Sequence, residues 1–209
     1  MSKVRVVWST PDAENMVAYC ARVSNPSNQN NTATSAKLLA YCIKHKHWSV
    51  FEMVNVCMEI ETTRDIARQV LRHRSFSFQE FSQRYAEAYE WERAGLRMQD
   101  TTNRQSSIET EDRELQRWWQ NEQGSLLAQA TRLYKNALNA GVAKEVARKV
   151  LPEGLTTSKM YMNGSLRSWM HYIDIRCGPE TQKEHRDIAE ACKTELVKLF
   201  PFIGEQNAN

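Results

Sequence analysis

The sequence predicts a mixed α+β fold in a single domain, with a mixed β-sheet flanked by long helices. The chain has 209 residues, which fits one domain or at most two small ones. Residues 4–8 and 51–62 have the β-branched content or the alternation that is typical of strands. Residues 111–139 repeat apolar side chains at helical spacing, and shorter segments do the same. Strands and helices in one chain of this length indicate the α+β class.

The composition is that of a globular protein without a membrane segment. Hydrophobic residues make up 41% and charged residues 25% of the chain, and both values are ordinary. The net charge of +3 fits an anionic small molecule better than a long nucleic acid, although the arginines are clustered. No apolar run approaches the ~18 residues of a membrane span, and the N-terminus reads as a strand without a signal core.

The cysteines predict reduced thiols, and hence a cytoplasmic protein. They are odd in number, widely spaced and without a C-x-x-C pair, so no disulfide framework and no metal site is indicated. They are Cys20, Cys42, Cys57, Cys177 and Cys192. His45 and His47 form a pair, but no third ligand follows at a recognisable spacing.

The first half of the chain begins with the strand at residues 4–8. Thr10 is expected to cap a helix that starts at Pro11, because proline suits the first helical position, and that helix ends near Val23. A polar loop and a second helix follow, and then a strand with one well-buried face; these segments are residues 25–34, 36–43 and 51–62. Thr62 or Thr63 is expected to cap the next helix.

The second half opens with a charged, polar segment, residues 87–108, which we interpret as an irregular insertion. A long helix then ends at Gly141, and a short helix is stopped by Pro152. Pro179 is expected at the first position of the last helix. The remaining predicted elements are a strand at residues 156–162, a helix at 165–175 and a frayed tail at 204–209.

Residues 69–85 carry the strongest chemical signal. Cationic or titratable side chains surround one carboxylate, Glu80, and three serines lie among them; these residues are Arg72, His73, Arg74, Arg84, Ser75, Ser77 and Ser82. Guanidinium groups bind phosphate in bidentate fashion, and hydroxyl groups can donate to the remaining oxygens. The segment is therefore a candidate phosphate site, with a solvated helix end as the alternative.

Other candidates have simpler explanations. Further arginines lie on non-core faces or in connections, and a shared anionic ligand or a solvated surface both explain them; they are Arg68, Arg148, Arg167 and Arg176. His47 is a candidate base or ligand contact, or an ordinary loop histidine. Cys177 beside Arg176 would have a depressed pKa if exposed, which makes it a candidate nucleophile. Ser82 lacks the G-x-S-x-G elbow, and no dinucleotide-binding or P-loop motif is present.

The central segment resembles the signature of the flavin-dependent thymidylate synthases, R-H-R followed after seven residues by Ser. Here it is Arg72-His73-Arg74 and Ser82, and Glu80, Arg84 and Tyr85 also match. Other segments are similar to the family in the same order, and nearly all of the chain outside residues 87–108 is covered. They are C-A-R-V-S (20–24), K-H-K-H-W-S-V-F-E (44–52), A-R-Q-V-L-R-H-R (67–74), K-E-V-A-R-K-V-L-P (144–152) and L-R-S-W-M-H-Y-I-D-I-R (166–176).

The resemblance implies an enzyme that converts dUMP to dTMP, with methylenetetrahydrofolate as carbon donor, reduced FAD as hydride donor and NADPH as the reductant of the flavin. It implies FAD contacts from His47, Ser49, Arg72, His73, Arg74, Glu80, Ser165, Arg167 and His171. It implies dUMP contacts from Gln69, Arg72, Glu80, Ser82, Arg84, Arg148 and Arg176, with Arg176 stabilising uracil ionised at N3. It also implies a homotetramer whose sites are shared between subunits.

The sequence departs from the family pattern at two of these positions. Ser165 stands where an amide side chain is expected, and His171 where Asn is frequent. The sequence disfavours two rival functions. An arginine-rich nucleic-acid-binding module is disfavoured by the low net charge. A structural subunit that has lost its chemistry is disfavoured because Arg72, Ser82, Arg84 and Arg176 are intact.

Overall fold

A computed structural model describes residues 2–88 and 90–207. The chain divides into two compact units. The first consists of Glu61–Val70 and Glu80–Lys159 together with Ser2, and the second of Lys3–Ile60, Leu71–Gln79 and Met160–Asn209. The division falls inside three strands, and the mixed α+β class is confirmed. The assignment of the whole chain to one domain stays a prediction.

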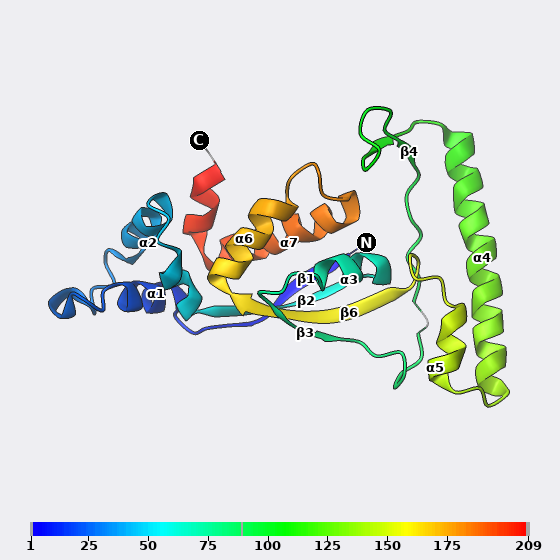
Figure 1. The fold of residues 1–209 in the computed structure, drawn as a ribbon, viewed down its shortest axis with the longest axis horizontal. Coiled ribbons are helices and arrows are strands. Elements are labelled where there is room, and N and C mark those ends of the chain that lie inside the picture. The colour runs from blue at the N-terminus through cyan, green and yellow to red at the C-terminus, as the bar shows by residue number, and fades with distance from the viewer. Residues whose placement is uncertain (1, 89, 208–209) are drawn as a thin grey trace. The chain divides into compact units, whose positions relative to one another are not determined.

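The main sheet has four strands in the order β1-β2-β6-β3 (Figure 1). They are β1 (Lys3–Ser9), β2 (Asn55–Thr63), β6 (Thr157–Ser165) and β3 (Ser77–Glu80). The strand β2 lies between two others, and both of its faces are buried. The prediction of one buried face is therefore wrong: Glu59 is 6% exposed, and it accepts two hydrogen bonds of 2.8 Å from Arg5 on β1.

Helices of the second unit build the core beside these strands. They are α1 (Ala13–Ala21), α2 (Ser35–Lys44), α6 (Leu166–Arg176) and α7 (Lys183–Leu199), with short 3₁₀ helices η1 (Pro26–Asn28), η2 (Trp48–Met53) and η4 (Pro201–Asn207). The helix α7 packs against β1 and against α6, which lies beside it in Figure 1. The buried side of α7 carries Ile188, Cys192 and Leu196 and also His185, whereas Leu199, which continues the apolar spacing, is only partly buried.

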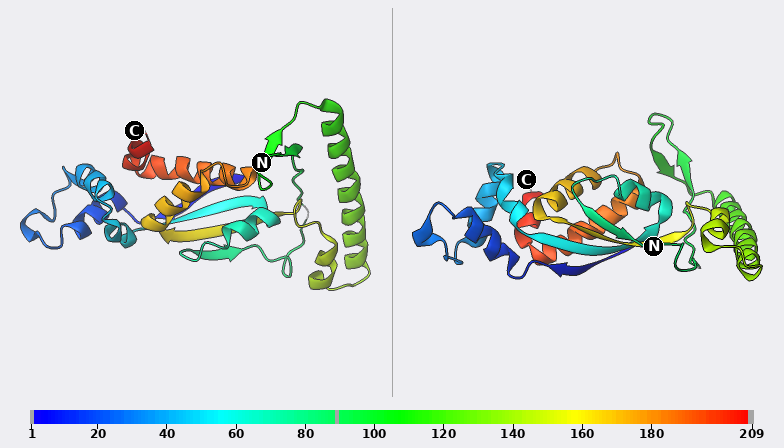
Figure 2. Two further views of the ribbon diagram at one scale, coloured as in Figure 1. Left: turned by 45° about the horizontal axis from the view of Figure 1, so that its top comes forward. Right: turned by 60° about the horizontal axis from the view of Figure 1, so that its bottom comes forward.

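The first unit contains the longest helix, α4 (Arg113–Asn139), which packs against α5 (Lys144–Ala147) and η3 (Arg148–Val150) (Figure 2). The Asp112 carboxylate caps α4 by accepting from the backbone N–H groups of Glu114 and Leu115 at 3.0 and 2.9 Å. Beyond the helix, Gly141 has φ +83°, a conformation that favours glycine. The short helix α3 (Arg64–Val70) and a two-stranded sheet complete the unit.

The predicted starts of two helices are wrong. Thr10 does not cap α1; its hydroxyl accepts from the backbone N–H of Asn55 at 3.0 Å, and the helix begins at Ala13 after Asp12, whose φ is +50°. Pro179 is not the first residue of α7. It lies in a turn in which the Thr181 N–H donates to the Gly178 carbonyl, and the helix begins at Lys183.

The strand predicted at residues 51–62 begins later, because the segment before it is the 3₁₀ helix η2. Phe51 is fully buried in η2, with its ring 6.2 Å from that of Trp48 and 6.3 Å from that of Phe202. A buried 3₁₀ turn thus accounts for the apolar position of Phe51, which the alternation predicts to lie in a strand. The tail is also shorter than predicted, since η4 extends to Asn207; residues 208–209 lie outside the described part.

The segment 87–108 is not wholly irregular. It contains β4 (Arg97–Gln99), which pairs antiparallel with β5 (Ser107–Glu109), and Met98 lies opposite Ile108. The Asp100 carboxylate organises the turn by accepting from the N–H groups of Thr102 and Asn103. Asp100 therefore marks the turn between β4 and β5 in the sequence, whereas the residues of the two strands show no alternation that would predict them.

Two expectations from composition can be compared with the structure. All five cysteines are free thiols. Among the described residues, no helix has both the length and the apolar character needed to cross a membrane, and no group of three or more His, Cys, Asp or Glu side chains is arranged to hold a metal ion.

Candidate active site

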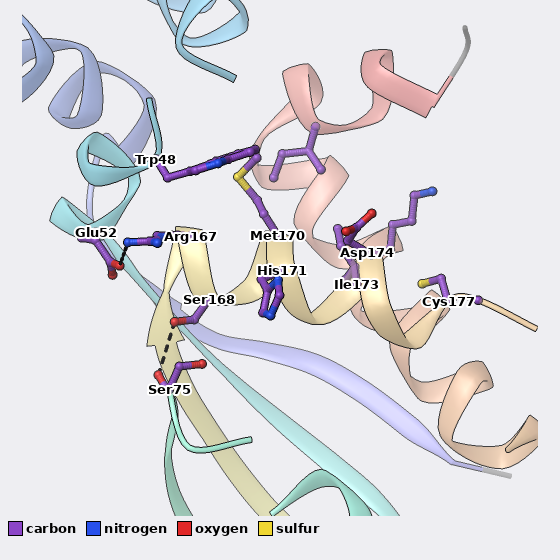
Figure 3. A pocket seen from close by; sticks show the side chains of 13 residues that line it. Trp48, Glu52, Ser75, Arg167, Ser168, Met170, His171, Ile173, Asp174 and Cys177 are labelled. Carbon is purple, nitrogen blue, oxygen red and sulfur yellow. Dashed lines mark hydrogen bonds and ion pairs between the residues drawn. The ribbon is translucent and has the colours of Figure 1, made fainter. Parts of the chain in front are cut away.

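The second unit contains a cavity of about 780 Å³ (Figure 3). The helix α6 supplies most of its wall, including Arg167, Met170 and His171, and Trp48 of η2 and Lys193 of α7 also line it. This volume lies within the ~300–1,000 Å³ of small-molecule sites. The wall therefore offers apolar surface together with several cationic or titratable groups.

The amphipathic sequence of α6 decides which side chains reach this cavity. Trp169 and Tyr172 are fully buried on one face, and the Trp169 indole N–H donates to the Val56 carbonyl at 2.9 Å. Arg167 and His171, four residues apart, lie on the exposed face. Anchoring the buried face against β2 thus directs the polar face into the cavity.

Glu52, which the sequence analysis did not single out, organises the entrance of α6. Its carboxylate lies 3.0 Å from the Arg167 guanidinium (Figure 3), and it also accepts a hydrogen bond from the Ser165 hydroxyl. Ser165 is the N-cap of the helix and accepts from the Ser168 N–H. Glu52 therefore connects two of the predicted flavin contacts. Glu52 is the last residue of the K-H-K-H-W-S-V-F-E segment, and its position close to His47 and Ser49 is the signal by which the sequence could have identified it as a site residue.

A second contact joins the central motif to the end of α6. The Arg176 Nε–H donates to His73 Nε2 at 2.9 Å. Burial, followed by the charges of Arg176, His171 and Arg72, lowers the pKa of His73 to about 4. His73 is therefore neutral at physiological pH, and the two residues, 103 positions apart in the sequence, meet in the folded unit.

In the first unit, Glu80 is held by residues that the sequence analysis missed. Its carboxylate lies 3.4 Å from the Arg64 guanidinium and accepts from the Ser158 hydroxyl at 2.9 Å. Gln69 lies on α3, the helix that begins with Arg64. No local pattern marks Arg64 or Ser158 as partners of Glu80, since they lie 16 and 78 residues away.

The other substrate candidates of this unit gather near α5. Arg84 lies 3.4 Å from Glu145 on α5, and its backbone N–H donates to the Ser82 hydroxyl at 3.3 Å. Arg148 follows α5 directly, in η3. The first unit thus brings Ser82 and Arg84 to the helix that precedes Arg148. Both members of the Arg84–Glu145 pair are more than half exposed, so a stronger anion can replace this carboxylate at little cost.

Several predicted residues lie outside the cavity. His47, Ser49, Arg72 and Arg74 are exposed residues of the second unit, and none of them is among the residues lining the cavity in the described part of the chain. Arg68, a further candidate for an anionic ligand, is paired with Glu153 at 2.7 Å.

Cys177 does not have the environment of a nucleophile. It lines the cavity, but burial raises its pKa above the ordinary value, and the neighbouring Lys193 lowers it by less. A depressed pKa is predicted only for an exposed thiol, and Cys177 is partly buried, so the loss of hydration outweighs the nearby positive charge.

The chain has an arginine-rich motif and a cavity of ligand size, and cationic groups lie at each of them. These features are typical of a protein that binds an anionic small molecule. Comparison with known proteins assigns the family. The family model described as "Thymidylate synthase complementing protein" matches residues 5–202, so the chain belongs to this family. The suspected relationship to the flavin-dependent thymidylate synthases is confirmed.

The curated relatives agree with this assignment. The chain is 51% identical over 201 residues to a probable flavin-dependent thymidylate synthase of Paramecium bursaria Chlorella virus 1, covering 96% of this chain and 93% of the relative. It is 50% identical over 191 residues to the flavin-dependent thymidylate synthase of Synechocystis sp., covering 91% and 87%.

Solved structures agree on the fold. The UMP/dUMP methylase PolB from Streptomyces cacaoi, bound with 5-Br dUMP, matches with a TM-score of 0.80 and 26% identity, over 98% of this chain and 93% of that one. The same enzyme bound with 5-Br UMP matches with a TM-score of 0.84 and 25% identity, over 98% and 92%.

Proposed function

We propose that this protein is a flavin-dependent thymidylate synthase that converts dUMP to dTMP. The observation that carries the proposal is the match of residues 5–202 to the family, within which the Arg72-His73-Arg74 motif and Ser82 keep the family spacing. The alternative of an arginine-rich nucleic-acid-binding module is not supported by any relative reported above. The protein is thus an enzyme of the methyltransferase class.

FAD fits the residues of the cavity on chemical grounds. A dinucleotide carries a pyrophosphate and an aromatic ring system. Arg167, His171 and Lys193 provide cationic or titratable groups for the former, and Trp48 and Met170 provide apolar surface for the latter. We propose that Arg167 and His171 hold FAD from within the cavity, with further contacts from His47, Ser49, Arg72, His73, Arg74, Glu80 and Ser165.

We propose that dUMP is held by Gln69, Arg72, Glu80, Ser82, Arg84, Arg148 and Arg176. A phosphate dianion requires several fixed cations, and Arg84 and Arg148 lie beside the same helix. FAD, reduced by NADPH, supplies the hydride of the reaction, and methylenetetrahydrofolate supplies the carbon. Arg176 stabilises the uracil ionised at N3, which makes C5 more nucleophilic. A guanidinium is a poor base, so Arg176 acts through its charge rather than by removing a proton.

We also propose a homotetramer that shares its sites between subunits. Apolar side chains recur at seven- and eight-residue spacing on the outer side of α4, where Trp118, Leu126 and Leu133 are each at least half exposed. Burying such a row against another subunit is favourable. The five free thiols support a cytoplasmic protein. Light scattering coupled to gel filtration measures the mass, and a monomer at all concentrations would contradict the assembly.

The function is tested by the absorbance of the purified protein and by its turnover. We expect a yellow protein that converts dUMP to dTMP when NADPH and methylenetetrahydrofolate are present. Arg176→Ala should abolish turnover and leave the fold intact, whereas Arg117→Ala, which removes an exposed arginine of α4, should leave turnover unchanged. A colourless protein that added FAD cannot restore, and that does not turn over dUMP, would refute the proposal.

A further inference from the structure

Four side chains from three segments of the second unit form a continuous contact, in which Tyr172 and His185 are buried and His73 and Arg176 are partly exposed. His73 follows α3 in the chain, Tyr172 and Arg176 lie four residues apart on α6, and His185 lies on α7. The Arg176 Nε–H donates to His73 Nε2 at 2.9 Å, and Tyr172 Oη lies 3.2 Å from His185 Nε2. The His73 and Tyr172 rings meet edge-on, with their centroids 4.9 Å apart and an interplanar angle of 80°.

The first of these contacts fixes the protonation of His73. A guanidinium has only donors, so His73 Nε2 must present its lone pair to Arg176. A neutral imidazole with an unprotonated Nε2 carries its proton on Nδ1. The low pKa of His73 agrees with this state, since burial and the charge of Arg176 both oppose a second proton.

The hydrogen bond between Tyr172 and His185 fixes the position of the Tyr172 ring, which packs against His73. Both residues are 0% exposed. Burial lowers the pKa of His185 to about 4, with a smaller effect from Arg176, and burial raises the pKa of Tyr172. Both groups are therefore neutral, which allows one hydrogen bond between them. A buried phenol that has such a partner cannot turn away without leaving an unsatisfied polar group.

Two further rings lie next to His73, which is itself partly exposed. Phe76 contacts it edge-on at 6.4 Å between centroids, and the His185 ring lies at 6.2 Å. The Phe76 ring is itself 4.8 Å from that of Trp169. His73 therefore packs among aromatic rings, and the hydrogen bond between Tyr172 and His185 links this cluster to α7.

We propose that Tyr172 and His185 are positioning residues, which hold the His73 ring in place so that its Nε2 accepts from Arg176, keeps the Nδ1–H tautomer and in turn fixes the orientation of the Arg176 guanidinium. The Nε–H of Arg176 is then committed to His73, and its two Nη groups remain as donors for a ligand. The role assigned to Arg176 at uracil rests on the proposed function. The tautomer of His73 and its support from α7 do not depend on the proposed function.

The test uses the full-length protein loaded with FAD. Tyr172→Phe keeps the ring and removes only the hydroxyl. Ile188→Val is the matched control, because Ile188 is fully buried on α7 and its substitution changes no polar group. We expect kcat to fall about tenfold in Tyr172→Phe, with the KM for dUMP changing less, while the two variants lower the thermal midpoint by similar amounts.

A second readout does not depend on turnover. The chain has five histidines, so a long-range ¹H–¹⁵N spectrum resolves each ring, and His73→Gln assigns one signal. We expect wild-type His73 to show protonated Nδ1 and bare Nε2 at pH 7, and Tyr172→Phe to shift that signal toward a mixture of tautomers. The conservative variant His185→Gln, which retains a polar group, should preserve the wild-type pattern better than His185→Leu.

The outcomes separate this inference from the proposed function. A changed His73 signal in Tyr172→Phe supports the positioning role even if no form of the protein acts on dUMP, which would count against the proposed function alone. An active wild type together with a Tyr172→Phe variant whose His73 signal and kcat are unchanged would overturn the inference. A loss of kcat that follows the thermal midpoint, with an unchanged His73 signal, would also overturn it by indicating a purely structural role.

Discussion

The substitution Gly164→Ala tests how tightly the central motif is packed against β6. Gly164 is buried on this strand, and a Cβ placed on it would lie 2.4 and 2.7 Å from two carbons of the Phe76 ring. Carbon atoms in van der Waals contact stand ~3.5–4.0 Å apart. The Phe76 ring would therefore have to move by about 1 Å to accept the methyl group.

The enclosure of Phe76 makes this movement costly. The ring is 8% exposed, and its centroid lies 4.8 Å from that of Trp169 and 6.0 Å from that of Tyr172, both fully buried. Overpacking of such a core costs ~1–3 kcal/mol. Replacing glycine also lowers the conformational entropy of the unfolded chain, which stabilises the folded protein by about 0.5 kcal/mol. We expect a net loss of about 1.5 kcal/mol, which lowers the thermal midpoint by roughly 3–6 °C in a chain of this size.

Thermal and chemical denaturation measure this effect. The control is Gly95→Ala, because Gly95 is exposed and no heavy atom lies within 4 Å of an added Cβ. In the Phe76→Leu background, where the smaller side chain leaves room, Gly164→Ala should cost at least about 1 kcal/mol less than in the wild type. If Gly164→Ala and Gly95→Ala have the same midpoint, the steric argument is refuted.

Three further predictions concern other parts of the chain. Asp112→Ala should lower the free energy of unfolding by about 1 kcal/mol because the cap of α4 is lost, and Asp112→Asn should retain most of it; urea denaturation compares the two. Arg167→Gln should weaken FAD binding by about tenfold because it removes a charged donor from the cavity, and a flavin absorbance titration that gives wild-type affinity would contradict this. The third concerns pH: because the pKa of His185 is about 4 in the folded protein against 6.5 in the unfolded chain, the unfolded chain binds more protons between these values. The free energy of unfolding should therefore fall by on the order of 3 kcal/mol as the pH drops from 6.5 to 4, and His185→Gln should lose this part of the pH dependence.

Elements with a strong local pattern were predicted from the sequence. The strand β1, the helix α4 and the helix α6 have the predicted type and nearly the predicted bounds. In α4, the apolar spacing predicts the helix and the glycine at position 141 predicts its end. The spacing does not give the buried face, because Leu127, Ala130 and Tyr134 are buried while apolar Trp118 and Leu126 are exposed. These signals are local because hydrogen bonds within a helix link residues four apart.

Elements whose formation depends on distant partners were missed. The strand β3 has four residues, and it exists because it pairs at the edge of a sheet next to β6, about 80 positions later. The start of α1 was misplaced because Thr10 bonds to Asn55 rather than to the helix. Neither partner can be inferred from the residues nearby, since pairing between strands is a tertiary contact.

The candidate site divides in the same way. The types and spacing of Arg72, His73, Arg74 and Ser82 identified the family, because rare residues at fixed intervals are a property of the sequence itself. The partners of the site residues came from the fold: Glu52 against Arg167, Arg64 against Glu80, and His73 against Arg176. The physical reason is that a side chain's charge state and direction depend on the atoms that surround it, and in this protein most of those atoms belong to segments far away in the chain.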